Sequence, residues 1–185
     1  MLKLESALKK IVGLLESKSF PYMIFGGLAN SIYGYSRQTF DIDVKIICDL
    51  NKEWSFLKKE LDKIGKILPE SPKDFFIDTK VLPIEIDNVR IDLVLAELPY
   101  ETNAVKNSVQ ATLIGVECQV CTAEDLIVQK SISEREKDWI DISEIIKIQR
   151  EVLNWNYIFT NCKQISEFLS DSTIIEKIKK LADEK

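Results

Sequence analysis

The sequence predicts an α/β (α+β) fold, with a small mixed, twisted β-sheet flanked by helices and a helical C-terminal subdomain after it. Three observations predict it. Short β-branched runs alternate with amphipathic segments up to about residue 121, and two of these runs carry acidic residues within apolar sequence. From Thr122 onward the sequence is helix-rich. We therefore expect an α/β core over residues 1–121 and a helical subdomain over residues 122–185, packed on the core.

The first part of the chain alternates between the two periodicities. Leucines and isoleucines at helical spacing predict an opening helix, and β-branched runs predict strands. Glycine pairs and single glycines between apolar segments mark breaks. The expected order is a helix at 3–18, a strand at 22–25, a break at Gly26-Gly27, a short helix ended by Gly34, and a strand at 40–47.

The rest of the core is expected to add a helix and several strands. Thr122, followed by Asp125 three residues later, is a capping signature for the first helix of the C-terminal subdomain. Before it we expect a helix at 53–66, strands near 75–79, 81–86 and 89–95, and a hairpin of 108–114 and 116–121 that turns at Gly115.

Composition limits the chemistry. The chain has 185 residues, 45% of them apolar and 30% charged, with a net charge of −5, which is typical of a soluble globular protein and not of one that coats nucleic acid. It contains no histidine, which excludes Ser-His-Asp and Cys-His catalysis and histidine-bound zinc. Catalysis would need carboxylates, lysines, hydroxyls or a metal. No signal peptide or membrane-length apolar stretch is present, so we expect a cytoplasmic protein without a membrane partner.

The four cysteines do not form a recognisable metal or redox motif. Cys118 and Cys121 are spaced as CxxC, but no second CxxC or histidine pair accompanies them. A redox pair would open a helix, whereas this pair ends a strand-like run. We expect packed, free thiols.

Three aspartates stand in segments that otherwise read as buried strands. Asp41 and Asp43, in "FDIDVKII", are two residues apart and therefore point to one face of a strand. Asp92 stands alone in "VRIDLVL". Neighbouring carboxylates repel unless a cation lies between them, and Mg²⁺ (or Mn²⁺) prefers such carboxylates together with substrate phosphates. Two acids from one strand and one from a neighbour suit metal-assisted phosphoryl or nucleotidyl transfer.

Gly26 and Gly27 have a role in the same interpretation. Without Cβ atoms they let a triphosphate approach backbone N–H groups at the start of the following helix. Taken singly, each signal has a simpler explanation: the glycines can form a turn, the DxD pair can lie on an edge strand, and Asp92 can pair with Lys or Arg. The joint arrangement is more specific than its parts.

The stretch "FGG", thirteen intervening residues and "DIDV" resembles the signature of the DNA polymerase β-like nucleotidyltransferase superfamily. It resembles most the minimal branch of abortive-infection, toxin-type nucleotidyltransferases, in which Arg-x-Thr-x-Asp-hydrophobic-Asp is common and matches Arg37, Thr39, Asp41 and Asp43 here. A second stretch, "TAEDLIVQKSISEREKDWIDISEII", is similar to the family's helical motif after the sheet. The resemblance covers roughly residues 5 to 150 and implies a nucleotidyltransferase fold.

The resemblance also implies roles for individual residues. Asp41, Asp43 and Asp92 would hold the catalytic metals, and Asp92 would also belong to the base machinery. Gly26 and Gly27 would cradle the triphosphate, with Arg37 and Thr39 as further nucleotide-binding residues; Arg37 could instead pair with a neighbouring acid. Lys130 would reach the phosphates, or remain a solvated lysine. Asp138 or Asp141 would position the nucleotide or acceptor, and Lys45 is a secondary candidate for a phosphate contact.

The activity implied is a Mg²⁺-dependent nucleotidyltransferase that moves an NMP from an NTP to a hydroxyl acceptor. The toxin-like branch implies the 3′ end of tRNA or a protein hydroxyl as acceptor, and hence a toxin–antitoxin component with a cognate antitoxin. One alternative is a small-molecule acceptor of the aminoglycoside or lincosamide type. Another is a non-catalytic nucleotide-binding or antitoxin-like module.

Overall fold

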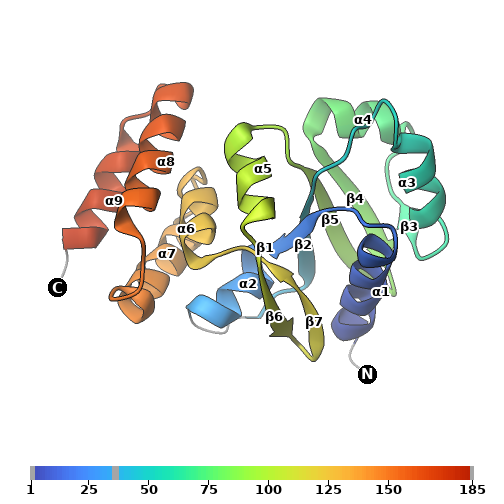
Figure 1. The fold of residues 1–185 in the computed structure, drawn as a ribbon, viewed down its shortest axis with the longest axis horizontal. Coiled ribbons are helices and arrows are strands. Elements are labelled where there is room, and N and C mark those ends of the chain that lie inside the picture. Colours follow the sequence, from blue (N-terminus) through green and yellow to red (C-terminus); the bar gives the residue numbers. More distant parts are fainter. Residues whose placement is uncertain (1–2, 35–37, 184–185) are drawn as a thin grey trace. The chain divides into compact units, whose positions relative to one another are not determined.

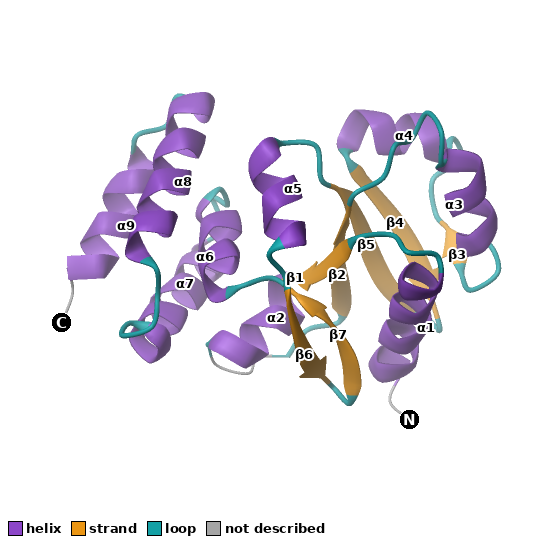
Figure 2. Ribbon diagram, in the orientation of Figure 1, coloured by secondary structure: helices purple, strands orange, loops and turns teal. Residues whose placement is uncertain are grey.

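The structure is a computed structural model of the chain and describes residues 3–34 and 38–183. The chain divides into two compact units. The first comprises Met1–Leu28 and Gln38–Cys121, and the second comprises Ala29–Arg37 and Thr122–Lys185. Figure 1 traces the chain by residue number, and Figure 2 distinguishes its helices from its strands.

The first unit is built on a mixed sheet. Its seven described strands lie in the order β3-β4-β5-β2-β1-β7-β6. β2 is parallel to β5 and β1 is parallel to β7, whereas the other neighbours are antiparallel. The strands are β1 (Tyr22–Phe25), β2 (Asp41–Ile46), β3 (Lys66–Ile67), β4 (Val81–Ile86), β5 (Val89–Leu95), β6 (Val109–Leu113) and β7 (Val116–Val120). This arrangement confirms the predicted fold class.

Helices accompany the sheet. α1 buries Leu8, Ile11 and Leu15 completely and contacts β2, β5 and β7, as its helical spacing of apolar residues predicts. The remaining helices that begin in this unit are α2 (Gly26–Tyr33), α3 (Trp54–Leu61), α4 (Pro72–Thr79) and α5 (Pro99–Lys106), after α1 (Lys3–Ser17). α2 follows β1 without an intervening loop, so both glycines of the pair belong to its first turn.

Most of the predicted elements are confirmed to within two residues at each end. They are the opening helix, the strands at 22–25, 40–47, 81–86 and 89–95, and the hairpin. The hairpin turns at Ile114-Gly115, where both residues have positive φ values of 44° and 83°. The helix predicted at 53–66 is shorter, because it ends at Leu61 and residues 66–67 form β3. α5 was not predicted.

The strand predicted at 75–79 is wrong, because this segment is the helix α4. Pro72 stands in the first turn, where its fixed φ favours a helix and its missing N–H costs nothing. Only Phe76 of this helix is buried, so the run "FFI" reflects one anchoring side chain and not a strand. Lys80 ends α4 in the left-handed conformation, and its N–H donates to the carbonyl of Phe76.

The second unit contains four helices after Thr122, among the described residues. They are α6 (Ala123–Ser131), α7 (Glu136–Gln149), α8 (Trp155–Leu169) and α9 (Thr173–Asp183). α6 contacts α7 and α8, and α9 contacts α7 and α8. The predicted cap is present, because the Thr122 side chain accepts the N–H of Asp125 at 3.1 Å.

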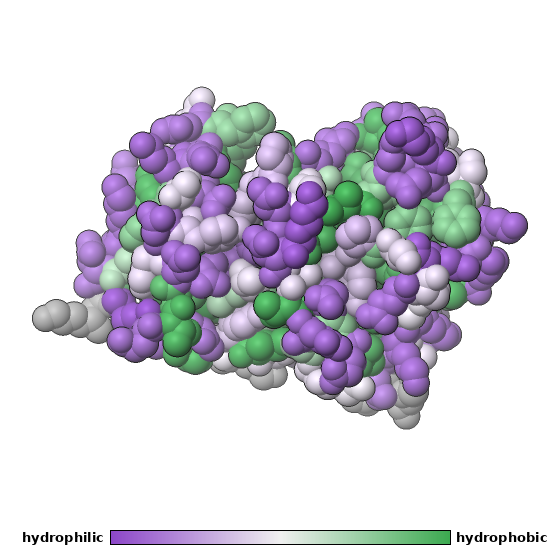
Figure 3. All heavy atoms as spheres, in the orientation of Figure 1, coloured by the Kyte–Doolittle hydropathy of each residue, from purple (hydrophilic) through white to green (hydrophobic). Residues whose placement is uncertain are grey.

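Over residues 3–34 and 38–183, no helix combines the length and the apolar character that a bilayer crossing demands. On the face drawn in Figure 3, hydrophilic side chains predominate and apolar ones form separate patches.

All four cysteines are described and none forms a disulfide, which confirms the expectation of packed thiols. Cys118, Cys121 and Cys162 are buried, and Cys48 is half-buried. Burial raises the pKa of Cys118 and of Cys162 to about 11, so these thiols stay protonated and unreactive at neutral pH.

Candidate active site

Two of the predicted carboxylates lie side by side on the sheet. Asp43 of β2 is the register partner of Asp92 on the parallel neighbour β5, and of Phe25 on β1. Register partners on neighbouring strands are about 5 Å apart and point to the same face. The tight turn Asp87-Asn88, with φ values of 54° and 60°, joins β4 to β5 and fixes the register of Asp92. The sheet therefore brings Asp43 and Asp92 together although they are 49 positions apart in the sequence.

The face that carries the aspartates differs from the opposite one. Ile42, Val44 and Ile46 alternate with the acidic positions of β2 and are completely buried. Asp43 is half-buried, and Asp41 at the start of the strand is exposed. The period of two that predicted a shared face for Asp41 and Asp43 is thus present in β2.

Gly26 lies directly against Asp43. Its φ of 66° is in the left-handed region that favours glycine, and a Cβ at this position would collide with the carboxylate of Asp43. A Cβ on Gly27 would lie only 2.7 Å from Oγ1 of Thr39. The glycine pair therefore lets the start of α2 approach both the DxD strand and the segment that precedes it.

The carboxylates have partners within the first unit. Thr39 Oγ1 donates to Oδ1 of Asp41 at 2.7 Å, and Arg90 Nε donates to Oδ1 of Asp92 at 2.9 Å. Arg90 is also the register partner of Asp41, so its positive charge stands on the same face as the acids. Pairing of Asp92 with an arginine is the simpler alternative that the sequence left open, and it is present. Arg37 lies outside the described residues.

The three aspartates are a donor set of the type that binds a divalent cation. Three carboxylates from two neighbouring strands on one face are hard oxygen ligands of the kind that Mg²⁺ and Mn²⁺ prefer, and Asp43 and Asp92 are in direct register. Within the described parts of the chain, no three Asp, Glu, Cys or His side chains are grouped closely enough to hold a metal. The residues fit a cation by type and register, although Arg90 is hydrogen-bonded to Asp92. Their assignment as ligands stays a prediction.

Lys45 continues the aspartate face but is engaged elsewhere. It is 5% exposed, and its Nζ donates to Oε1 of Glu101 on α5 at 2.6 Å. The same ammonium lies 5.2 Å from the ring centroid of Phe25. Burial would raise the pKa of Glu101, but the charge and hydrogen bond of Lys45, together with hydrogen bonds from the N–H groups of Leu98 and Glu97, hold that pKa below its usual value. Lys45 thus ties the DxD strand to α5.

The second unit contains a buried ionic cluster at the other predicted positions. Lys130 of α6 is 6% exposed, and its Nζ donates to Asp138 at 2.9 Å and to Asp141 at 2.6 Å, both on α7. Asn30 of α2 also donates to Asp141, at 3.5 Å. The sequence left open which of the two aspartates matters, and both hold Lys130. Its role as a phosphate ligand stays a prediction, and it would require the ammonium to leave these carboxylates.

Asp138 accepts hydrogen bonds from several side chains of this cluster. Besides Lys130, its carboxylate accepts hydrogen bonds from Ser133 at 2.8 Å and from Arg135 at 2.7 Å. Burial would raise the pKa of Asp138, but the hydrogen bonds from Lys130 and Ser133 and the two nearby positive charges hold it below its usual value.

Sequence reasoning missed Arg90, Glu101, Ser133 and Arg135 as parts of these two clusters. Arg90 carries a readable signal, because it lies two residues before Asp92 on a strand and so shares its face. Ser133 and Arg135 belong to the segment "SEREKD", which leads into the first turn of α7 and whose charges are equally typical of a solvated helix start. The pairing of Lys45 with Glu101 spans 56 positions and has no local signal.

Solved structures share the fold of this chain. ANT(2″)-Ia in complex with adenylyl-2″-tobramycin is similar with a TM-score of 0.59 at 14% identity, over 88% of this chain and 97% of that one. An antigenic nucleotidyltransferase-like protein from Paracoccidioides brasiliensis has a TM-score of 0.55 at 14% identity, over 95% of this chain and 93% of that one. The lincomycin-bound lincosamide antibiotic adenylyltransferase LnuA has a TM-score of 0.52 at 16% identity, over 78% of this chain and 97% of that one.

These identities are too low to carry more than the fold, and that fold is the nucleotidyltransferase fold. No protein-family model matches the sequence, and no similar sequence was found among curated proteins.

Proposed function

We propose that this protein is a nucleotidyltransferase that uses a divalent metal, Mg²⁺ or Mn²⁺, to move an NMP from an NTP to a hydroxyl acceptor. The observation that carries the proposal is the register of Asp43 with Asp92, with Gly26 packed against the carboxylate of Asp43. A purely structural sheet has no need for acids in register at a position where a glycine must leave room for one of them. The nucleotidyltransferase fold supports the same activity.

In the proposed reaction, the acceptor oxygen bonds to the α-phosphorus, the bond between the α-phosphorus and the bridging oxygen breaks, and pyrophosphate leaves. The metal, when bound, neutralises the triphosphate and lowers the pKa of the attacking hydroxyl. Asp41, Asp43 and Asp92 would hold that cation, and Asp92 would accept the hydroxyl proton. The N–H groups of Gly26 and Gly27, at the positive end of α2, hold phosphate oxygens. Asp92 must first leave Arg90, whose guanidinium is then available to a phosphate.

For the acceptor, we propose a macromolecular hydroxyl, either the 3′ end of tRNA or a protein side chain. This proposal rests on the resemblance of "RQTFDID" and "SEREKDWIDI" to the toxin-type branch. It implies that a cognate antitoxin controls the activity.

A second acceptor class is a small antibiotic-like molecule. ANT(2″)-Ia with its adenylylated tobramycin and LnuA with its lincomycin have the same fold as this chain. The match covers 97% of each of those two chains.

The experiment is label transfer from each α-³²P-NTP, with Mg²⁺ or Mn²⁺, into total tRNA, cell protein and a panel of aminoglycosides and lincosamides. We expect label in one pool, and its loss in Asp43→Asn and in Asp92→Asn. Asp74→Asn, an exposed acid in the first turn of α4, is the matched control and should transfer as the wild type does.

Each result has a defined meaning. Label in tRNA or protein supports the macromolecular acceptor, and label only in an antibiotic replaces it with the small-molecule class. Folded wild-type protein that labels none of the pools, with or without added cell extract, would contradict the proposed activity and leave a non-catalytic nucleotide-binding module.

A further inference from the structure

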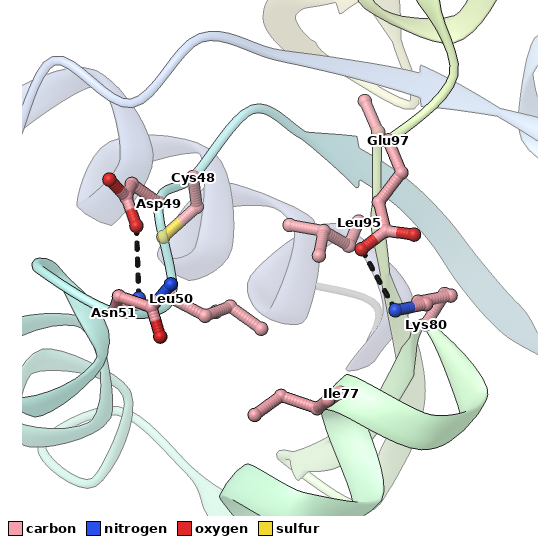
Figure 4. Close-up of a pocket in the computed structure, with 9 residues that line it drawn as sticks. Cys48, Asp49, Leu50, Asn51, Ile77, Lys80, Leu95 and Glu97 are labelled. Atoms are coloured by element: carbon pink, nitrogen blue, oxygen red, sulfur yellow. Dashed lines mark hydrogen bonds and ion pairs between the residues drawn. The ribbon is translucent and has the colours of Figure 1, made fainter.

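The first unit contains a cavity beyond the C-terminal ends of β2 and β5, whereas Asp41 and Asp43 lie at the N-terminal end of β2. Its volume is about 300 Å³. It is formed by the segment that follows β2, by the end of α4 and by the end of β5 (Figure 4). In Figure 4 Lys80 and Glu97 stand at one side of it, Asp49 and Asn51 at the other, and Ile77 rises from α4 between them.

The position of the cavity is one that open α/β sheets use for ligands. Parallel strands end at the same edge of a sheet, and ligands bind beyond their carboxyl ends. β2 and β5 are parallel and end in register at Ile46 and Leu95. Ile46 lies three positions after Asp43, and Leu95 lies three positions after Asp92. Three positions correspond to about 10 Å along a strand. A ligand here would contact the far ends of the two strands that carry the candidate catalytic aspartates.

The cavity is lined by both positively and negatively charged side chains. Lys80 Nζ and Glu97 Oε1 form an ion pair of 2.8 Å, with side chains 40% and 46% exposed. Asp49, 41% exposed, pairs with the exposed Lys52 at its outer side and accepts the N–H of Asn51. Exposed pairs of this kind contribute little to stability, so a ligand can replace them at small cost.

Lys80 occupies a backbone position that a glycine would fill with less strain. Its φ is 61° and its ψ is 9°, the left-handed conformation in which most helices that end this way carry glycine. The long side chain, held in this conformation, carries the only lysine ammonium among the residues that line the cavity. This placement of Lys80 is an observation independent of the shape of the cavity.

The walls between the charges are apolar. Leu50 and Leu95 are 8% and 5% exposed, and Ile77 is 38% exposed although it lines the cavity. An aliphatic group of a ligand would cover Ile77 and remove that apolar surface from water.

We propose that this cavity binds a small zwitterion, an α-amino acid with an aliphatic side chain. Its carboxylate binds Lys80, its ammonium binds Glu97, and its side chain packs on Ile77, Leu95 and Leu50. Two carboxylates against one lysine disfavour a phosphate or a nucleotide. Covalent attachment is not part of the proposal, because burial raises the pKa of the lining thiol Cys48 to about 12 and keeps it protonated.

The test is direct binding to the full chain without any nucleotide, so that its outcome does not depend on the proposed transferase activity. Isothermal titration and saturation-transfer NMR would compare L-leucine with 3-methylbutylamine, which lacks the carboxylate, and with 4-methylpentanoate, which lacks the ammonium. We expect L-leucine to bind, and each half-ligand to bind at least about tenfold more weakly, because each loses one charge-assisted contact.

Two variants and two matched controls complete the test. Lys80→Gly removes the ammonium and relieves the positive φ, so the protein should be at least as stable as the wild type while L-leucine binding falls about tenfold or more. Glu97→Gln should lower binding similarly. Lys73→Met and Glu70→Gln change the same residue types outside the cavity lining and should bind as the wild type does. No binding of L-leucine, equal binding of the amine alone, or unchanged binding in Lys80→Gly would overturn the proposal.

Discussion

Gly26 is the residue at which backbone geometry and site geometry depend on each other most closely. Any other residue there would have to adopt a φ of 66°, and its Cβ would collide with the carboxylate of Asp43. We expect Gly26→Ala to lower the free energy of unfolding by at least about 1–2 kcal/mol from the left-handed backbone alone. We also expect it to displace Asp43 and abolish nucleotidyl transfer.

The matched control for Gly26→Ala is Gly13→Ala. Gly13 lies within α1, and a Cβ there would meet no neighbouring atom within 4 Å. The free energy of unfolding of this variant should rise by about 0.5–1 kcal/mol, because alanine has a higher helix propensity than glycine. Urea unfolding of both variants measures the difference. A Gly26→Ala protein as stable as Gly13→Ala would show that the start of α2 does not press on Asp43.

Lys130 compensates the charges of two buried aspartates in the second unit. Replacing Lys130 with Met leaves Asp138 and Asp141 buried together, and breaking a buried pair in this way costs about 3–5 kcal/mol. Adding Asp141→Asn to Lys130→Met removes one of the two buried negative charges and should recover part of the loss. Thermal and urea unfolding of the single and double variants measure it. Lys130→Met with wild-type stability would contradict the cluster.

At the scale of one element, α6 begins with a cap that can be tested by itself. Thr122 accepts the N–H of Asp125, so Thr122→Ala should lower the free energy of unfolding by about 1 kcal/mol. Thr122→Ser keeps the hydroxyl and serves as the control, with a smaller loss. Equal losses in the two variants would show that the cap hydrogen bond contributes nothing.

How far the sequence predicts the elements depends on how local their signals are. The strand at 89–95 was predicted because its apolar residues alternate, and the hairpin because Gly115 marks its turn. The segment at 75–79 was misassigned because "FFI" contains aromatic and β-branched residues, whereas Pro72 and the left-handed Lys80 decide in favour of a helix. α5 was missed because its apolar residues are few, and only Ala104 and Val105 are buried.

The same distinction applies to the candidate site. A period of two along one strand was enough to place Asp41 and Asp43 on one face, and a lone acid in an apolar run was enough to single out Asp92. The register that brings Asp92 beside Asp43 depends on the pairing of β2 with β5, which no local pattern encodes. The partners Arg90 and Glu101 follow from that pairing and from α5, so they were found only in the structure.

At the scale of the whole molecule, acid should destabilise both units. Hydrogen bonds and positive charges hold the pKa of Asp138 and of Glu101 below their ordinary values of about 3.9 and 4.3. Because these are the unfolded-state values, the stabilisation is complete above them and is lost as the pH falls through the lower, folded-state pKa. Urea unfolding between pH 7 and pH 3 should show falling stability at the acid end.

Variants assign that loss to each unit. Asp138→Asn and Glu101→Gln should each be less stable than the wild type at pH 7 and lose less on acidification, because the titrating group is gone. Asp74→Asn, an exposed acid of α4, should follow the wild-type curve. If the free energy of unfolding of the wild type did not decrease as the pH was lowered past about 4, this assignment would be contradicted.

If Asp43 and Asp92 hold a divalent cation together with the nucleotide, as we propose, Mn²⁺ binding depends on their carboxylates. Electron paramagnetic resonance would follow Mn²⁺ titrated into the protein with a non-hydrolysable NTP, beside the nucleotide alone and the Asp43→Asn and Asp74→Asn variants. We expect Mn²⁺ binding beyond that of the nucleotide, weakened about tenfold or more in Asp43→Asn and unchanged in Asp74→Asn. Binding no stronger than that of the nucleotide alone, or equal binding in Asp43→Asn, would contradict the proposal.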